Sequence, residues 1–111
     1  MSNYITHGMR DDNQLEPFEV GQVQWIRCPG EGDREALSCG FWHVTPDDAP
    51  EPFDLVSHGD ETIFLLQGAI RIEPEGGEEF TLTAGCTASF NDGARSRWTI
   101  LESVVEHFVY S

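Results

Sequence analysis

The sequence predicts an all-β domain built as an antiparallel sandwich or barrel. Turn sequences rich in Gly, Pro, Asn and Asp recur at short intervals, and the stretches between them have strand character. Many short strands with regular turn signals are typical of sandwiches and barrels. The length of 111 residues suits one domain with one core. The candidate strands are residues 23–28, 38–44, 53–57, 61–67, 69–73, 79–83, 87–90, 95–102 and 104–110.

The first part of the chain differs from the rest. Residues 1–17 are polar and have no periodic pattern, so we expect a flexible N-terminal arm followed by a single domain over residues 18–111. From there on, turn sequences separate the candidate strands. They are "CPGEG" at 28–32, "TPDDAPEP" at 45–52, "SHGD" at 57–60, "PEGGE" at 74–78, "AGC" at 84–86 and "NDGA" at 91–94.

The central strands show two kinds of pattern. Residues 69–73 and 79–83 alternate apolar and polar side chains, which predicts one buried face for each. Residues 63–66 are Ile, Phe, Leu and Leu, so both faces of that strand are apolar. We expect it to be covered on one side by the core and on the other by a second sheet or a partner subunit.

The C-terminal segment is compatible with two structures. Leu101, Val104, Val105 and Phe108 have the spacing of a helix face, although the same segment also has strand character. Periodicity leaves both a strand and a helix open there.

Composition excludes some classes of partner. There are 20 acidic residues against six basic ones, all arginine, for a net charge of −14. Such a surface repels phosphate backbones and anionic headgroups, so we expect neither nucleic acid nor a membrane as partner. The excess of acid fits a solvated surface, and it also fits adaptation to a salty cytoplasm.

The cysteines and the N-terminus indicate the compartment. Cys28, Cys39 and Cys86 are an odd number without a C-x-x-C pair, so we expect reduced thiols. The N-terminus lacks a basic region followed by an apolar one, and no stretch is long enough to cross a bilayer. We therefore expect a cytoplasmic protein.

Two spaced motifs carry a family resemblance. Glu61, six residues, Gly68 and the hairpin sequence after it resemble the E-x6-G half of the first cupin motif. Gly85, five residues and "NDG" ending in Gly93 resemble the second motif, G-x5-P-x-G, with Asn91 in place of the usual proline. The flanks "GFWHVTP" and "GARSRWTILESVVEHFV" resemble cupins of the ureidoglycine aminohydrolase type. The resemblance covers about residues 39–110.

The resemblance implies a double-stranded β-helix, the jelly-roll barrel of the RmlC-like cupins, with residues 104–110 as a closing strand. Metal-binding cupins place two histidines, as H-x-H, before the glutamate and another in the second motif. In this chain the H-x-H positions fall on Asp54 and Val56 or on Leu55 and Ser57. The second-motif position falls on Ser96. We therefore expect no firmly held metal and no cofactor.

Four residues are candidates for a site inside the barrel. They are Glu61, which would orient a ligand or act as a general base, and Ser96, Trp98 and Asp54, which would bind ligand. Trp98 and Ser96 share a strand face, so an aromatic wall would stand beside the hydroxyl. Glu61 could also face solvent at a strand start, and Trp98 could serve packing alone.

Other polar residues have simpler interpretations. We expect His58 to be a solvated turn residue, and His43 and His107 to be structural residues on strands. For His43, lining of the barrel mouth is the alternative. Arg95 and Arg97 alternate with Ser96 and Trp98, so they should face outward toward surface carboxylates.

The sequence leads to one main functional hypothesis and two alternatives. The main hypothesis is a homodimeric cupin that binds a small polar molecule in its barrel. The first alternative is a metal-dependent enzyme acting on a small ureido or amino-acid-like substrate. The second is a non-catalytic dimeric accessory protein. Whether a reaction is catalysed is left open, because one barrel fold carries many functions.

Overall fold

The computed structural model describes residues 4–111, so residues 1–3 of the expected arm lie outside the described residues. The regular secondary structure of the described chain is almost entirely strand, which confirms the predicted all-β class. Its elements are the 3-10 helix η1 (Asp12–Gln14) and the strands β1 (Glu16–Pro17), β2 (Gln22–Arg27), β3 (Ser38–Val44), β4 (Phe53–Val56), β5 (Glu61–Pro74), β6 (Phe80–Thr83), β7 (Thr87–Phe90) and β8 (Arg95–Tyr110).

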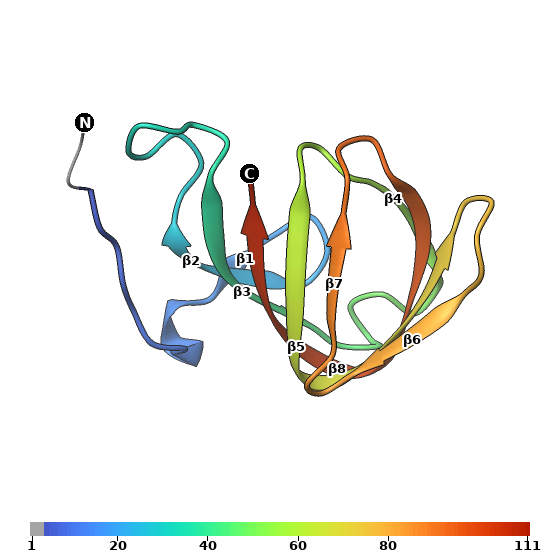
Figure 1. Cartoon of the computed structure of the whole chain (residues 1–111). Coiled ribbons are helices and arrows are strands. Elements are labelled where there is room, and N and C mark those ends of the chain that lie inside the picture. Colours follow the sequence, from blue (N-terminus) through green and yellow to red (C-terminus); the bar gives the residue numbers. More distant parts are fainter. Residues whose placement is uncertain (1–3) are drawn as a thin grey trace.

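The strands form a jelly-roll barrel in which every pairing is antiparallel. The order is β1-β2-β3-β8-β5-β6, with β4 also paired to β8 and β7 also paired to β5 (Figure 1). The C-terminal half of β8 pairs with β3, and its N-terminal half pairs with β4. In the same way, β5 pairs first with β7 and then with β6. The two long strands therefore pass through both walls of the barrel and join them.

Two breaks predicted from the sequence are absent. Residues 61–67 and 69–73 form one strand, β5, and residues 95–102 and 104–110 form one strand, β8. Gly68 explains why β5 is continuous. Its φ of 94° and an irregular register with β8 let the strand bend without ending. A Cβ at this position would lie 2.2 Å from the carbonyl oxygen of Ser103 on β8. The glycine therefore permits close contact of two bent strands, not a turn between separate ones.

The segment that was compatible with a helix is a strand. Within β8, Val104 pairs with Val44 of β3, and the ladder continues to Tyr110. Val104 is 2% exposed, whereas Leu101 is 39% exposed, so these residues do not share one buried face. The backbone hydrogen bonds to β3 and β5 outweigh the local helical spacing.

The apolar run in β5 divides between the core and the outer surface. Ile63 and Leu65 are fully buried in the barrel core. Phe64 points the other way and is 41% exposed. It lies opposite His107 of β8, which in turn lies opposite Phe41 of β3. This row of rings is the outer face of the strand, which no second sheet covers in the described chain.

Part of the predicted arm contacts the sheet. The Gln24 side chain of β2 accepts a hydrogen bond from the Asp11 backbone N–H and donates one to the Met9 carbonyl, both at 2.8 Å. Gln24 is consequently 1% exposed although it is polar. Strand β1 then pairs with the start of β2. Within residues 4–111, no helix has the length and apolar character needed to cross a membrane.

Candidate functional site

A cavity of about 200 Å³ lies at the inner surfaces of β3, β4, β5 and β8. Most of its wall is apolar, and a few polar side chains face it, as is usual for small-molecule sites. The volume is smaller than the roughly 300–1,000 Å³ of pockets for drug-sized ligands. The aromatic part of the wall consists of Phe18, Trp42, Phe53, Trp98 and Phe108, and the polar part includes Glu61, Glu106 and Tyr110.

Glu61 lies at the start of β5 and faces into the barrel. It is 4% exposed and stands opposite Tyr110 of β8 and Phe90 of β7. Burial disfavours the charged carboxylate and raises the pKa of Glu61 to about 7, and a hydrogen bond from Tyr110 opposes part of that shift. The predicted inward position of Glu61 is confirmed. Its carboxyl can both give and take a proton near neutral pH.

Glu106 is a second buried acid in the same cavity. It is 2% exposed and lies on β8 between Trp42 of β3 and Leu65 of β5. Burial and the nearby charge of Glu61 raise the pKa of Glu106 well above its ordinary value. Its Oε2 atom has no hydrogen-bond partner. A buried polar atom without a partner is uncommon in native proteins and is open to an incoming ligand.

Tyr110 completes the polar part of the wall. Burial, together with the charges of Glu61 and Glu106, raises the pKa of the Tyr110 hydroxyl. The hydroxyl therefore stays protonated and donates a hydrogen bond to the Glu61 carboxyl. Its oxygen lone pairs remain available as acceptors.

Trp98 is part of the aromatic wall and is 1% exposed. Its indole N–H donates a hydrogen bond of 2.8 Å to the hydroxyl of Ser96. The ring meets Trp42 edge to face at 6.0 Å between centroids and also packs against Phe53 and Phe90. Ser96 is not among the residues that line this cavity, so its contribution there is to hold the Trp98 ring.

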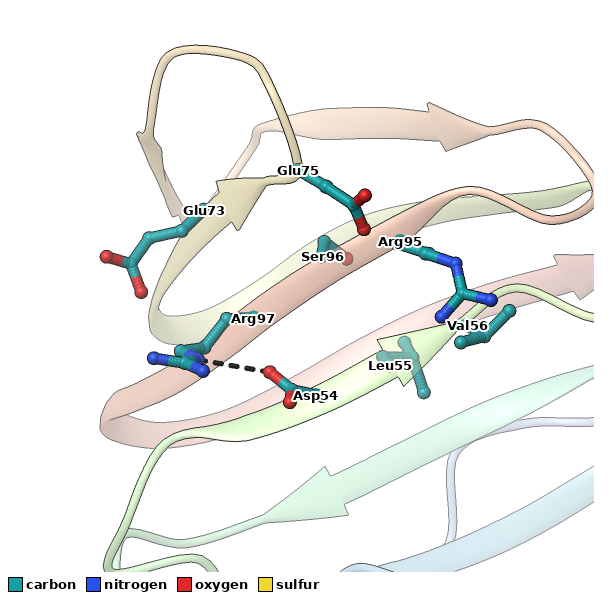
Figure 2. A pocket seen from close by; sticks show the side chains of 8 residues that line it. All are labelled: Asp54, Leu55, Val56, Glu73, Glu75, Arg95, Ser96 and Arg97. Carbon is teal, nitrogen blue, oxygen red and sulfur yellow. Dashed lines mark hydrogen bonds and ion pairs between the residues drawn. The ribbon is translucent and has the colours of Figure 1, made fainter.

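Asp54 borders the cavity, but its carboxylate is engaged on the outside of the barrel. There its Oδ1 accepts a hydrogen bond of 3.0 Å from Nε of Arg97, and 76% of its side chain is exposed. Figure 2 shows this pair in a second pocket, of about 370 Å³, which is also lined by Glu73, Glu75, Arg95 and Ser96. The structure therefore brings Glu61 and Trp98 together but leaves the Asp54 carboxylate outside.

The histidines lie away from the cavity. His43 faces Asp12 at 3.9 Å on the outer side of the sheet. The His107 ring packs 5.6 Å from that of Phe41, and His58 is exposed in its turn. The three cysteines are free and partly buried, as predicted.

The architecture and motifs agree with a match to a family model. The model of the EutQ-like cupin domain matches residues 31–108, which is most of the chain. The chain belongs to the EutQ-like cupin family. The broader cupin resemblance is thereby established, whereas the narrower resemblance to ureidoglycine aminohydrolases stays a prediction. No curated protein matches the chain.

Solved structures support the fold of this EutQ-like cupin. A DUF861 family protein from Thermotoga maritima is 27% identical, with a TM-score of 0.57 over 64% of this chain and 76% of that one. The putative ethanolamine utilization protein Q from Salmonella typhimurium LT2 is 18% identical, with a TM-score of 0.69 over 86% and 76%. Ectoine synthase from P. lautus is 14% identical, with a TM-score of 0.72 over 90% and 70%.

The EutQ-like cupin lacks the donor set that metal-binding cupins use. Of the two possible H-x-H registers, Leu55 and Ser57 are the ones that face inward, since Asp54 and Val56 pair with exposed arginines. The second-motif position is Ser96. No group of three or more His, Cys, Asp or Glu side chains in residues 4–111 is arranged to hold a metal ion. The cavity offers carboxyl and phenol oxygens but no imidazole, so its residues do not fit the transition metal that metal-binding cupins hold.

Sequence reasoning missed Glu106 and Tyr110. A signal for them was present. Glu106, Phe108 and Tyr110 alternate along one strand and so share a face, and a glutamate between apolar residues on an inward face is unusual. The helix alternative for this segment obscured the alternation.

Proposed function

We propose that this EutQ-like cupin binds a small polar molecule in the barrel cavity, with Glu61 as a polar anchor. The observation that carries the proposal is the cavity itself, where a buried carboxyl without a full set of partners faces an aromatic wall. Glu106 leaves Oε2 unpartnered. Buried carboxyls are costly unless something satisfies them, and a bound molecule would do so.

A ligand screen on matched variants tests this proposal. Glu61→Gln keeps the shape of the side chain and removes its charge, whereas Glu73→Gln makes the same change at an exposed position of the same strand. We expect at least one small polar compound to raise the Tm of the wild type and of Glu73→Gln, and to bind Glu61→Gln at least tenfold more weakly. Equal binding to all three proteins would remove Glu61 from the site.

Catalysis by proton transfer is the second candidate function. Its support is the pKa of about 7 for Glu61, because a general acid or base works best when its pKa is close to the working pH. The substrate would be a small ureido or amino-acid-like compound. If the compound found in the screen is converted, Glu61→Gln should lower kcat by a factor of roughly 10²–10⁴. Elemental analysis of the untagged protein tests the accompanying prediction that no transition metal is firmly bound.

We also propose that the protein is a homodimer, whether or not the cavity is used. The support is the outer row formed by Phe64, His107 and Phe41, where Phe64 is 41% exposed beside a half-buried histidine and phenylalanine. Exposed apolar side chains on a sheet face are often covered by a two-fold contact.

A further inference from the structure

We propose that the ligand of the cavity is a small protonated amine, held by the carboxylates of Glu61 and Glu106 and by the aromatic rings around them. This inference rests on the proposed binding function and adds the charge and donor chemistry of the ligand.

The cavity has no positively charged side chain to balance its two carboxyls. None of the residues that line the cavity is Lys, Arg or His. The arginine nearest in the register, Arg97, is paired with Asp54 on the outer face. Two buried carboxyls without a basic partner must either stay protonated or obtain a cation from outside. A cationic ligand would supply the charge that the protein lacks.

The cavity also presents several hydrogen-bond acceptors. An ammonium group has three N–H donors and no acceptor. The cavity offers it the carboxyl of Glu61, the hydroxyl oxygen of Tyr110 and the carboxyl of Glu106, whose Oε2 has no partner within the described chain. Acceptors on facing positions of β5 and β8 therefore match the donors of one small cation.

Aromatic rings form the wall beside these acceptors. Trp42 and Trp98 meet edge to face at 6.0 Å, with an angle of 71° between the rings, so the two rings point in different directions within the wall. Phe53 and Phe108 extend the wall. Aromatic faces attract cations within about 6 Å, by roughly 0.5–2 kcal/mol, and most strongly when water is excluded. The same rings would pack against a short alkyl group on the amine.

The charge state of the cavity predicts how binding depends on pH. The titratable groups that line it are Glu19, Asp54, Glu61, Glu106 and Tyr110, and all of them are acids. Burial raises the pKa of Glu61 to about 7. A cation binds the ionised carboxylates, so its affinity should rise as the pH increases through this value. An anion would need the protonated carboxyls, and its affinity should fall over the same interval.

The test compares three compounds that share one carbon skeleton, namely n-butylammonium, butyramide and butyrate. Binding to the full chain is measured by thermal shift and calorimetry between pH 6 and pH 8.5, at constant ionic strength set with sodium chloride. We expect saturable binding of n-butylammonium that tightens at least threefold across this range. Butyramide and butyrate should bind at least tenfold more weakly at pH 8.

Variants separate the cavity from the acidic surface, which attracts any cation. Glu106→Gln should weaken n-butylammonium binding at least tenfold. Glu102→Gln, the same change at an exposed position of β8, should leave it unchanged. Equal loss in both variants would show surface screening and would overturn the inference.

The remaining outcomes distinguish this inference from the proposed function. Preferred binding of butyramide or butyrate that depends on Glu61 would overturn the amine assignment while supporting a small-molecule site. Affinity for n-butylammonium that falls as the pH rises would also overturn the amine assignment. The preference among the three compounds and its pH dependence are measured on the wild type, so both remain decisive if a variant fails to fold. A broad screen in which no compound of any charge depends on Glu61 would contradict the proposed function itself.

Discussion

Glu61 and Glu106 differ from the other acidic residues because they are buried. The protein has 20 Asp and Glu residues, and these two are the ones buried on the inner surface of the barrel within the described residues. Burial keeps their protons bound to a higher pH than in the unfolded chain. Because burial makes their ionised forms unfavourable, a ligand that pairs with the carboxylates would change their protonation.

This burial makes stability depend on pH in a predictable direction. The pKa of Glu61 rises from 4.5 to about 7 on folding, so between these values the folded state binds more protons than the unfolded state. Stability is therefore lost as the pH rises through this window, by at most about 3 kcal/mol from Glu61. Glu61→Gln cannot ionise. We expect its Tm to match that of the wild type near pH 5 and to exceed it at pH 8.

Thermal unfolding at both pH values checks this prediction. Glu73→Gln is the control, since its exposed position should give a difference from the wild type that is much smaller at either pH. A wild-type Tm at pH 8 equal to or above that of Glu61→Gln would contradict the raised pKa of Glu61.

At the scale of elements, the long strands β5 and β8 position the cavity. Each contributes to both walls, so residues from the start of β5 and both halves of β8 meet inside the barrel. The bend near Gly68 lets β5 pass from one wall to the other, because β5 lies there against Ser103 of β8. The cavity thus depends on a backbone contact between residues that do not line it.

Replacing Gly68 by alanine should disrupt this contact. The added Cβ would meet the Ser103 carbonyl oxygen at 2.2 Å, and the φ of 94° is strained for any L side chain. Gly85 is a matched control, since its φ is 92° but nothing lies within 4 Å of an added Cβ. We expect Gly85→Ala to cost about 1 kcal/mol and Gly68→Ala at least about 3 kcal/mol.

Urea unfolding of the two variants gives the comparison. Equal losses would show that backbone strain alone accounts for the glycine and that the strands can separate at this point. A Gly68→Ala protein that is insoluble while Gly85→Ala folds would agree with the expectation.

At the scale of the whole molecule, the dominant feature is charge. The net charge of −14 is spread over a chain of 111 residues. The ion pairs Arg71–Glu79, at 3.6 Å, and Arg97–Asp54, at 3.0 Å, both involve largely exposed side chains. Exposed pairs contribute little to stability, so much of the repulsion between carboxylates remains.

Added salt should therefore stabilise the protein. We expect the Tm to rise between 20 mM and 500 mM sodium chloride, because screening lengths shorten from roughly 20 Å to below about 5 Å. Sodium chloride is suitable since its ions are not strongly excluded from protein surfaces. A Tm that is flat or falls with salt would show that the acidic surface is already neutralised.

The outer row of rings predicts the mass in solution. We expect light scattering at micromolar concentration to give twice the chain mass of 12.4 kDa. Phe64→Asp places a charge in the middle of the row and should give the single-chain mass with the same circular dichroism spectrum. Thr81→Asp, at an exposed position of β6, is the control. A single-chain mass for the wild type would refute the dimer.

The sequence by itself determined the strands and the family motifs, because alternation and turn residues are local signals. Every predicted strand segment lies in a strand of the structure to within a residue or two, although the structure joins two pairs of them into β5 and β8. Glu61 faces inward, as the E-x6-G spacing implied. The E-x6-G motif also identified Gly68, which lies at a bend within β5 and not at a turn between two strands.

Only the tertiary structure decided which side chains meet. A shift of one residue in a strand reverses the face of each side chain, so sequence alone left Asp54 and Leu55 as alternatives. Pairing of β4 with β8 places Leu55 inside and the Asp54 carboxylate beside Arg97. Glu106 and Glu61 are distant in the chain, and they come to one cavity because β5 and β8 pair along their length. Burial then sets their pKa values, and burial is a property of the assembled barrel.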